Sequence, residues 1–117
     1  MLTFYITPQP QPRINYKGRF TARAKRYYQY CEDLKKEALI NHYHVGECLN
    51  ITFYLPMPKS WSQKKKALMD QQPHRQKPDL SNLVKAFEDA LLKEDCQIHT
   101  YQEIDKMWGK TGMIIIH

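Results

Sequence analysis

The sequence lacks the features that mark membrane-spanning and secreted proteins. Its longest apolar run, Met113–Ile116, is far too short to cross a bilayer. The first residues have neither a basic start nor a long apolar segment, so we expect no signal peptide. The three cysteines, Cys31, Cys48 and Cys96, form no CxxC pair and are typical of reduced thiols. These absences predict a soluble cytoplasmic protein without a membrane partner.

Internal repeats, low-complexity segments and linkers are also absent. The 117 residues suit a single domain over 1–117 and leave no room for two. Acidic residues are outnumbered, because 12 Asp and Glu stand against 18 Lys and Arg and leave a net charge of +6. Lys and Arg beside phosphates release counterions, so this excess favours a nucleic acid as partner. Charge alone does not distinguish DNA from RNA or from an anionic membrane.

Hydrophobic periodicity and turn residues predict an alternation of strands and helices. Leu2, Phe4 and Ile6 alternate with polar residues, which indicates a strand. The predicted elements are a strand at 2–7, a helix at 21–40, a strand at 48–55, a short helix at 60–68, a helix at 81–93, and strands at 97–103 and 113–117. A mobile basic loop at 71–78 and a hairpin turn at 109–112 complete the chain. The order β-α-β-α-α-β-β predicts an α+β domain in which helices pack on one mixed sheet.

The helix predicted at 81–93 is the most informative element. Projected at 100° per residue, its apolar residues gather on one side. Asn82, Lys85 and Asp89 lie on the opposite side, and Asp79 stands at the helix entrance. A solvated face on an amphipathic helix is the simplest explanation of this pattern. The residues around the helix suggest a second explanation.

A second acidic pair, Glu94–Asp95, follows directly after this helix. Carboxylates from separate elements suit Mg²⁺, because this cation prefers oxygen ligands and keeps several waters. Beside a phosphodiester, such a metal can activate a water and neutralise the charge that develops on the phosphate oxygens. Lys85 would add a fixed positive charge at the same place. The pattern therefore allows a hydrolytic site for phosphodiesters.

The same region resembles the signature of RusA-type Holliday junction resolvases. The matching run is Lys77-Pro-Asp-Leu-Ser-Asn-Leu-Val-Lys-Ala-Phe-Glu-Asp-Ala-Leu91, followed by Glu94-Asp-Cys-Gln-Ile98. The proline-rich start at 8–13 and the basic stretch up to Thr21 resemble the family's N-terminal strand, loop and helix. The resemblance implies a phage-type, Mg²⁺-dependent endodeoxyribonuclease of recombination and repair, with Mn²⁺ as an alternative metal. It also implies a homodimer, which places two equal sites on a four-way DNA junction and nicks two opposed strands.

Carried over residue by residue, the resemblance implies roles for the acidic and basic residues. Asp79 and Asp95 are expected to bind the metal, and Glu94 to assist them. Lys85 is expected beside the scissile phosphate, with Asn82 supporting the site. Basic segments would hold the arms of the junction. The expected DNA contacts are Arg13, Lys17, Arg19, Arg23, Lys64, Lys65, His74, Arg75 and Lys77.

Two departures from the family pattern leave alternatives open. Ser81 stands where many members have a second aspartate, and a hydroxyl is a poorer ligand for a hard cation. The connection at 91–94 is also shorter than expected for the family. The metal would then rely on the remaining carboxylates or on Asp89, and Ser81 could instead cap the helix. A junction-binding protein with weak or absent cleavage is the first alternative, and a small basic RNA-binding or regulatory protein is the second.

Two further patterns carry little functional signal. The run at 109–112 resembles the end of a P-loop, but Ile104 occupies the position of the required earlier glycine. We therefore expect no nucleotide cofactor. His42, His44 and Cys48 are too few for a zinc site, and a histidine near a helix end more often offsets the helix dipole.

Overall fold

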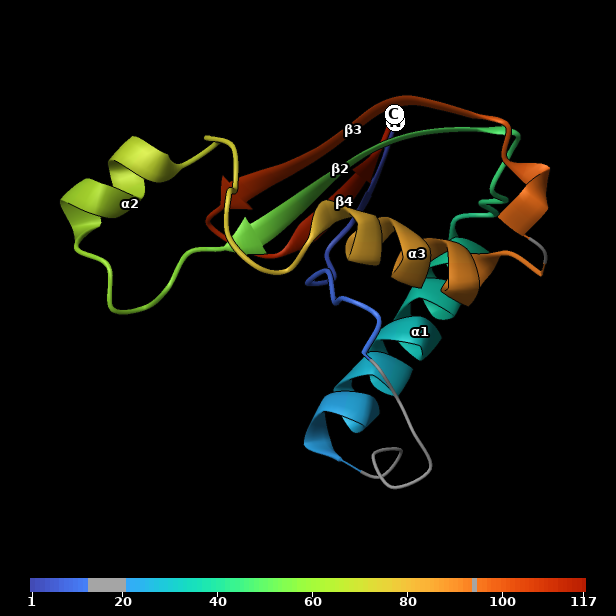
Figure 1. The fold of residues 1–117 in the computed structure, drawn as a ribbon, viewed down its shortest axis with the longest axis horizontal. Helices are drawn as coiled ribbons and strands as arrows, with labels where there is room; N and C mark the ends of the chain where they lie inside the picture. Colours follow the sequence, from blue (N-terminus) through green and yellow to red (C-terminus); the bar gives the residue numbers. More distant parts are fainter. Residues whose placement is uncertain (13–20, 94) are drawn as a thin grey trace.

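The computed structural model describes residues 1–12, 21–93 and 95–117, and of Asp95 it describes the backbone alone. The elements follow in the order β1 (Leu2–Phe4), α1 (Ala22–Ile40), β2 (Cys48–Pro56), α2 (Gln63–Met69), α3 (Leu80–Leu91), the 3-10 helix η2 (Asp95–Gln97), β3 (Thr100–Gly109) and β4 (Met113–Ile116) (Figure 1). This order confirms the predicted α+β class. In the described ranges, no helix combines the length and apolar character that a membrane span needs.

The described strands form one mixed sheet in the order β1-β4-β2-β3. β2 runs parallel to β3 and antiparallel to β4, which is itself antiparallel to β1. The predicted hairpin at 109–112 is therefore wrong, because β3 and β4 lie on opposite sides of β2 and do not pair with each other. The connection instead passes the end of β2, where the Met57 amide donates to the Gly109 carbonyl at 3.3 Å.

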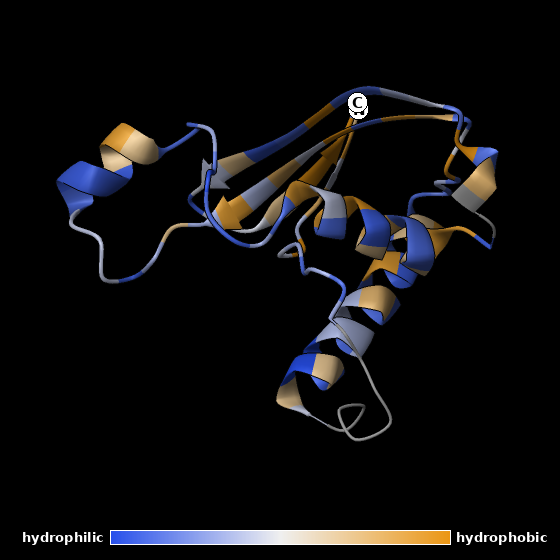
Figure 2. Ribbon diagram, viewed as in Figure 1, coloured by the Kyte–Doolittle hydropathy of each residue, from blue (hydrophilic) through white to orange (hydrophobic). Residues whose placement is uncertain are grey.

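α1 and α3 pack against each other on the same side of the sheet (Figure 1). Thr21 caps α1, because its hydroxyl accepts from the Ala24 amide at 3.2 Å. The rings of Phe87 on α3 and Phe53 on β2 meet edge to face with centroids 6.4 Å apart. Figure 2 shows hydrophobic residues along β4 and the end of β2, facing helices of mixed character. The fully buried side chains of this core include Phe4, Leu34, Leu49, Ile51, Phe53, Leu83, Phe87 and Ile114.

α2 stands apart from this layer, since none of its residues is buried. It lies beyond the ends of β2 and β3, away from α1 and α3 (Figure 1). The rings of Trp61 and Trp108 lie 4.8 Å apart between centroids and join the segment before α2 to the end of β3. The expected packing of helices on the sheet thus holds for α1 and α3, whereas α2 forms a basic projection.

The predicted mobile loop at 71–78 is attached to the outer edge of β3, and we call this segment the strap. The Gln71 amide donates to the Trp108 carbonyl, and the Trp108 amide donates to the Gln72 carbonyl, each at 2.9 Å. The His74 amide donates to the Lys106 carbonyl at 2.9 Å, and Pro73 forms a bridge with Met107. These bonds hold the strap in place like a short strand. They also determine where Asp79 enters α3, because Asp79 directly follows the strap.

Gly112 provides a test of the way β1 and β4 meet. A Cβ atom on Gly112 would lie between 2.2 and 2.6 Å from atoms of Thr7, which leaves no room for a side chain. We expect Gly112→Ala to lower the free energy of unfolding by about 1–3 kcal/mol, the usual effect of overpacking. Gly46→Ala is the control, because nothing lies within 4 Å of its Cβ position. Urea denaturation followed by circular dichroism gives both values, and equal values for the two variants would contradict this packing.

Candidate functional site

An open pocket of about 520 Å³ lies at the N-terminal end of α3. Three elements line it: the proline-rich segment after β1, the first turn of α1, and the junction of the strap with α3. The pocket brings together the predicted site residues Arg23, Lys77, Asp79 and Asn82. Cations and oxygen donors thus meet at one opening, although they come from distant parts of the sequence.

Asp79 is the N-terminal capping residue of α3, but its side chain makes no capping hydrogen bond. The backbone carbonyl of Asp79 instead accepts the amides of Asn82 and Leu83 at 3.1 and 3.2 Å. The carboxylate is 55% exposed, and the Lys77 ammonium lies 3.6 Å from its Oδ1 atom. An exposed carboxylate that is not used for capping can bind a cation from the pocket side. Ser81 is already inside α3, so the alternative in which Ser81 caps the helix is wrong.

Lys85 and Asp89 continue the polar face of α3 away from the pocket. The Lys85 ammonium lies 3.2 Å from Asp89 Oδ1, and the Gln11 side-chain amide donates to Asp89 Oδ2 at 2.5 Å. Asp89 therefore orients Lys85 and holds the proline-rich segment against α3. It stands ten residues after Asp79, which is about 15 Å along a helix. The alternative in which Asp89 replaces a metal ligand beside Asp79 is not compatible with that separation.

Asp95 lies beyond the opposite end of α3. The helix has 12 residues, so its ends are about 18 Å apart. Asp79 directly precedes the helix, and Asp95 begins η2 after it (Figure 1). One chain therefore does not bring the two predicted metal ligands together. The described residues hold no group of three or more His, Cys, Asp or Glu side chains that could bind a metal. Glu94 lies outside the described residues.

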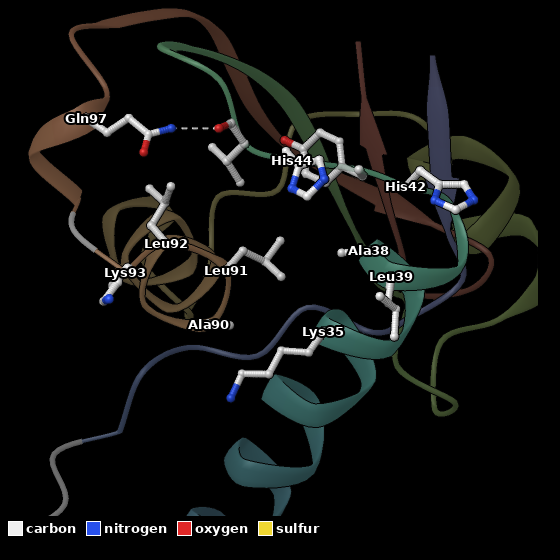
Figure 3. A pocket seen from close by; sticks show the side chains of 12 residues that line it. Lys35, Ala38, Leu39, His42, His44, Ala90, Leu91, Leu92, Lys93 and Gln97 are labelled. Carbon is white, nitrogen blue, oxygen red and sulfur yellow. Dashed lines mark hydrogen bonds between the residues drawn. The ribbon is translucent and has the colours of Figure 1, made fainter.

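A second pocket, of about 450 Å³, marks the end of α3 near η2 (Figure 3). Lys35 of α1 and Lys93 after α3 stand at this pocket, with Leu91 and Leu92 on its apolar side. The Gln97 side-chain amide donates to the Val45 carbonyl at 2.7 Å, as the dashed line in Figure 3 shows. The backbone of η2 is therefore held against the loop that follows α1. This contact fixes where Asp95 begins the turn.

The predicted DNA-contacting residues occupy two regions of the described chain. Arg23 and Lys77 are exposed and line the Asp79 pocket, Arg75 is exposed on the strap, and Lys64 and Lys65 are exposed on α2. The Lys65 ammonium also lies 4.2 Å from the centre of the Trp61 ring. Arg13, Lys17 and Arg19 lie outside the described residues.

His74 is not the solvated residue of a basic loop that the sequence suggests, and its contact with DNA stays a prediction. Its side chain is buried, and its ring packs against the Trp108 ring with centroids 4.0 Å apart and an angle of 42° between the ring planes. Burial and the nearby Lys106 charge lower the pKa of His74 below its ordinary value, which favours the neutral ring. His74 thus anchors the strap to the end of β3.

Lys106 is a residue at this site that the sequence analysis missed. Its ammonium donates to the Gln76 carbonyl at 2.6 Å and to the Pro78 carbonyl at 2.7 Å. Burial lowers the pKa of Lys106, and the nearby Asp79 carboxylate opposes this shift. A lysine among the large residues of a strand could have indicated this role. The predicted strand ended at residue 103, however, so Lys106 was not recognised as a strand residue.

Comparison with known protein families identifies the family of this chain. The family model described as endodeoxyribonuclease RusA matches residues 4–117, which include the strap, α3 and η2. Comparison with curated protein sequences gave no significant match. Because the family model covers nearly the whole chain, the protein belongs to the RusA endodeoxyribonuclease family, whose members are Holliday junction resolvases and generally metal-dependent nucleases.

Proposed function

We propose that this protein is a Mg²⁺-dependent endodeoxyribonuclease that resolves four-way and other branched DNA junctions in recombination and repair. The observation that supports the chemistry best is the pocket at the start of α3. It places the Asp79 carboxylate and the Asn82 side chain beside the cations Arg23 and Lys77. Oxygen donors next to cations suit a metal and a phosphodiester together. Family membership supports branched DNA as the substrate.

The donor set fits a hard cation only in part within one chain. Asp79 offers a carboxylate that caps no helix, and Asn82 in the same pocket offers an amide oxygen. Both are ligand types that Mg²⁺ and Mn²⁺ accept. The predicted partner ligand, Asp95, stands beyond the other end of α3. A complete site therefore requires a carboxylate from elsewhere.

A two-fold dimer supplies that carboxylate by symmetry. If two copies associate with their α3 helices antiparallel, the start of one helix lies beside the end of the other. Asp79 of one protomer would then approach Asp95 of the partner subunit, and Glu94 keeps its proposed assisting role. Each dimer would contain two such composite sites, and this number matches paired cleavage of two opposed strands. We propose that the active species is this homodimer.

The other site residues have distinct parts in the proposed reaction. When bound, the metal would activate a water and neutralise the charge on the phosphate oxygens. Lys85, which Asp89 holds at 3.2 Å, would stabilise negative charge on the phosphate. Arg23 and Lys77 at the pocket would hold the scissile strand in place. Asn82, one turn before Lys85, would orient the groups around Asp79.

The exposed basic residues outside the pocket are proposed to hold the arms of the junction. Arg75 is exposed on the strap, and Lys64 and Lys65 are exposed on α2. Arg13, Lys17 and Arg19 are proposed contacts that precede α1. Because α2 projects away from the sheet, it can reach DNA beyond the cleavage point (Figure 1). Contacts of this kind set affinity and orientation without reading the base sequence.

Cleavage of a labelled four-way junction tests the proposed activity. With Mg²⁺ or Mn²⁺ we expect paired nicks, which a chelator should abolish. Asp79→Asn and Asp95→Asn should each lower the cleavage rate about a hundred-fold or more, because each removes a charged metal ligand. Junction binding in chelator should persist or strengthen in both variants, since a negative charge is removed. Tight binding by the wild type without nicks, even with Mn²⁺, would instead identify a junction-binding protein.

Mixing the two inactive variants tests the composite site. In a dimer of one Asp79→Asn and one Asp95→Asn chain, one composite site has both substitutions and the other has none. We expect single nicks at about a quarter of the wild-type rate, because random exchange makes half of the dimers mixed. The control mixes Asp79→Asn with the doubly substituted chain, which leaves no intact site. A mixture as inactive as this control would show that each site lies within one chain.

Salt dependence tests whether α2 contacts DNA. Replacing Lys64 and Lys65 together with Gln should weaken junction binding and reduce the slope of log affinity against log salt by about two. The matched control replaces Lys25 and Lys36 with Gln, which removes the same charge from two exposed residues of α1 that line neither pocket. Binding is measured by fluorescence anisotropy at several salt concentrations. The same loss of slope in both pairs would indicate an effect of net charge rather than a contact by α2.

A further inference from the structure

Lys106 joins the edge of the sheet to the residue that precedes Asp79. Its ammonium donates to the Pro78 carbonyl at 2.7 Å and to the Gln76 carbonyl at 2.6 Å. Pro78 is covalently bonded to Asp79, so the first of these bonds lies one residue from the proposed metal ligand. We propose that Lys106 is a positioning residue that sets the Asp79 carboxylate for the metal. This inference rests on the proposed function.

Lys106 holds the strap through both its backbone and its side chain. Its backbone carbonyl accepts the His74 amide at 2.9 Å, which fixes the middle of the strap on β3. Its side chain then reaches the two carbonyls nearer to α3. A single residue thus spans the turn between the strand-like part of the strap and the first turn of the helix. Movement of this turn would displace Asp79 relative to Asn82 in the pocket.

The two hydrogen bonds are of a strong kind. The donor is a charged ammonium on a partly buried residue, and the acceptors are two backbone carbonyls. Charge-assisted bonds are shorter and stronger than bonds between neutral groups. Pro78 has no amide hydrogen, so its carbonyl is its only backbone group that can form a hydrogen bond. Groups that orient a metal ligand affect metal affinity although they do not touch the metal.

Removal of the ammonium should leave the fold in place. The strap keeps its backbone bonds to Trp108 and the contact of the His74 ring with the Trp108 ring. Lys106 is not among the residues that form the hydrophobic core. The expected consequence is therefore local: a less well-placed Asp79, weaker metal binding, and no change in metal-free junction binding.

The experiment measures Mn²⁺ binding to the full-length protein without DNA by electron paramagnetic resonance. Lys106→Met should raise the dissociation constant about ten-fold. Lys106→Arg keeps a cation with several donors and should restore the affinity to within about three-fold of wild type. Lys110→Met, a change to an exposed lysine on the connection to β4, is the matched control and should bind Mn²⁺ like wild type. The Mg²⁺ concentration needed for half-maximal junction cleavage should rank the variants in the same order as their Mn²⁺ affinity. At high Mg²⁺ concentration, the cleavage rate of Lys106→Met should recover.

The outcomes separate this inference from the proposed function. Wild type that binds no Mn²⁺ and cuts no junction would overturn both. Wild type that binds and cuts, beside a Lys106→Met variant with unchanged affinity and metal dependence, would overturn the positioning role alone. So would a Lys106→Arg variant as weak as Lys106→Met. If Lys106→Met fails to fold, Lys106→Gln decides instead: its shorter side chain should weaken Mn²⁺ binding about three-fold, and wild-type affinity in it would overturn the inference.

Discussion

The packing of α3 against α1 and the sheet fixes both ends of the helix. Leu83 and Phe87 are fully buried, and Phe87 meets Phe53 of β2 edge to face. A helix anchored along its length cannot bring its ends together, so about 18 Å separates its two ends. If Asp79 and Asp95 share a metal, as proposed, the two residues must come from different chains. In the proposed enzyme, catalysis thus depends on association, and an isolated protomer would bind DNA without completing a site.

The outer edge of β3 is the second fixed point of the site. Three residues of this strand, 106–108, pair with the strap, and the Trp108 ring lies between His74 and Trp61. The same strand end thus holds the entrance of Asp79 on one side and the segment leading to α2 on the other. A DNA arm bound at α2 would be held at a defined orientation to the pocket. Substrate shape, rather than base sequence, is what such a spacing can recognise.

Local sequence patterns predicted α3 and its polar face, but they did not predict which segments pair with β3. The periodicity of α3 and the place of Asp79 at its entrance depend on neighbouring residues, and the structure has both. The hairpin at 109–112 was wrong because its glycines signal a turn but do not show that β2 lies between β3 and β4. His74 and Lys106 were misjudged or missed for a similar reason. Their roles arise from contacts between segments about thirty residues apart, and strand pairing of this kind depends on tertiary context.

The two departures from the family pattern have different weight in this geometry. A short connection after α3 would matter most if Asp95 had to reach Asp79 of its own chain, and no loop of that size could span the helix. In a two-fold dimer, the connection sets only how far Asp95 extends toward the partner, so a shorter one is compatible with a site. Ser81 has no such compensation, because it lines a groove with Lys85 and Glu88 and would bring no charge to the proposed metal. With fewer anionic ligands, metal affinity depends more strongly on how well Asp79 itself is placed.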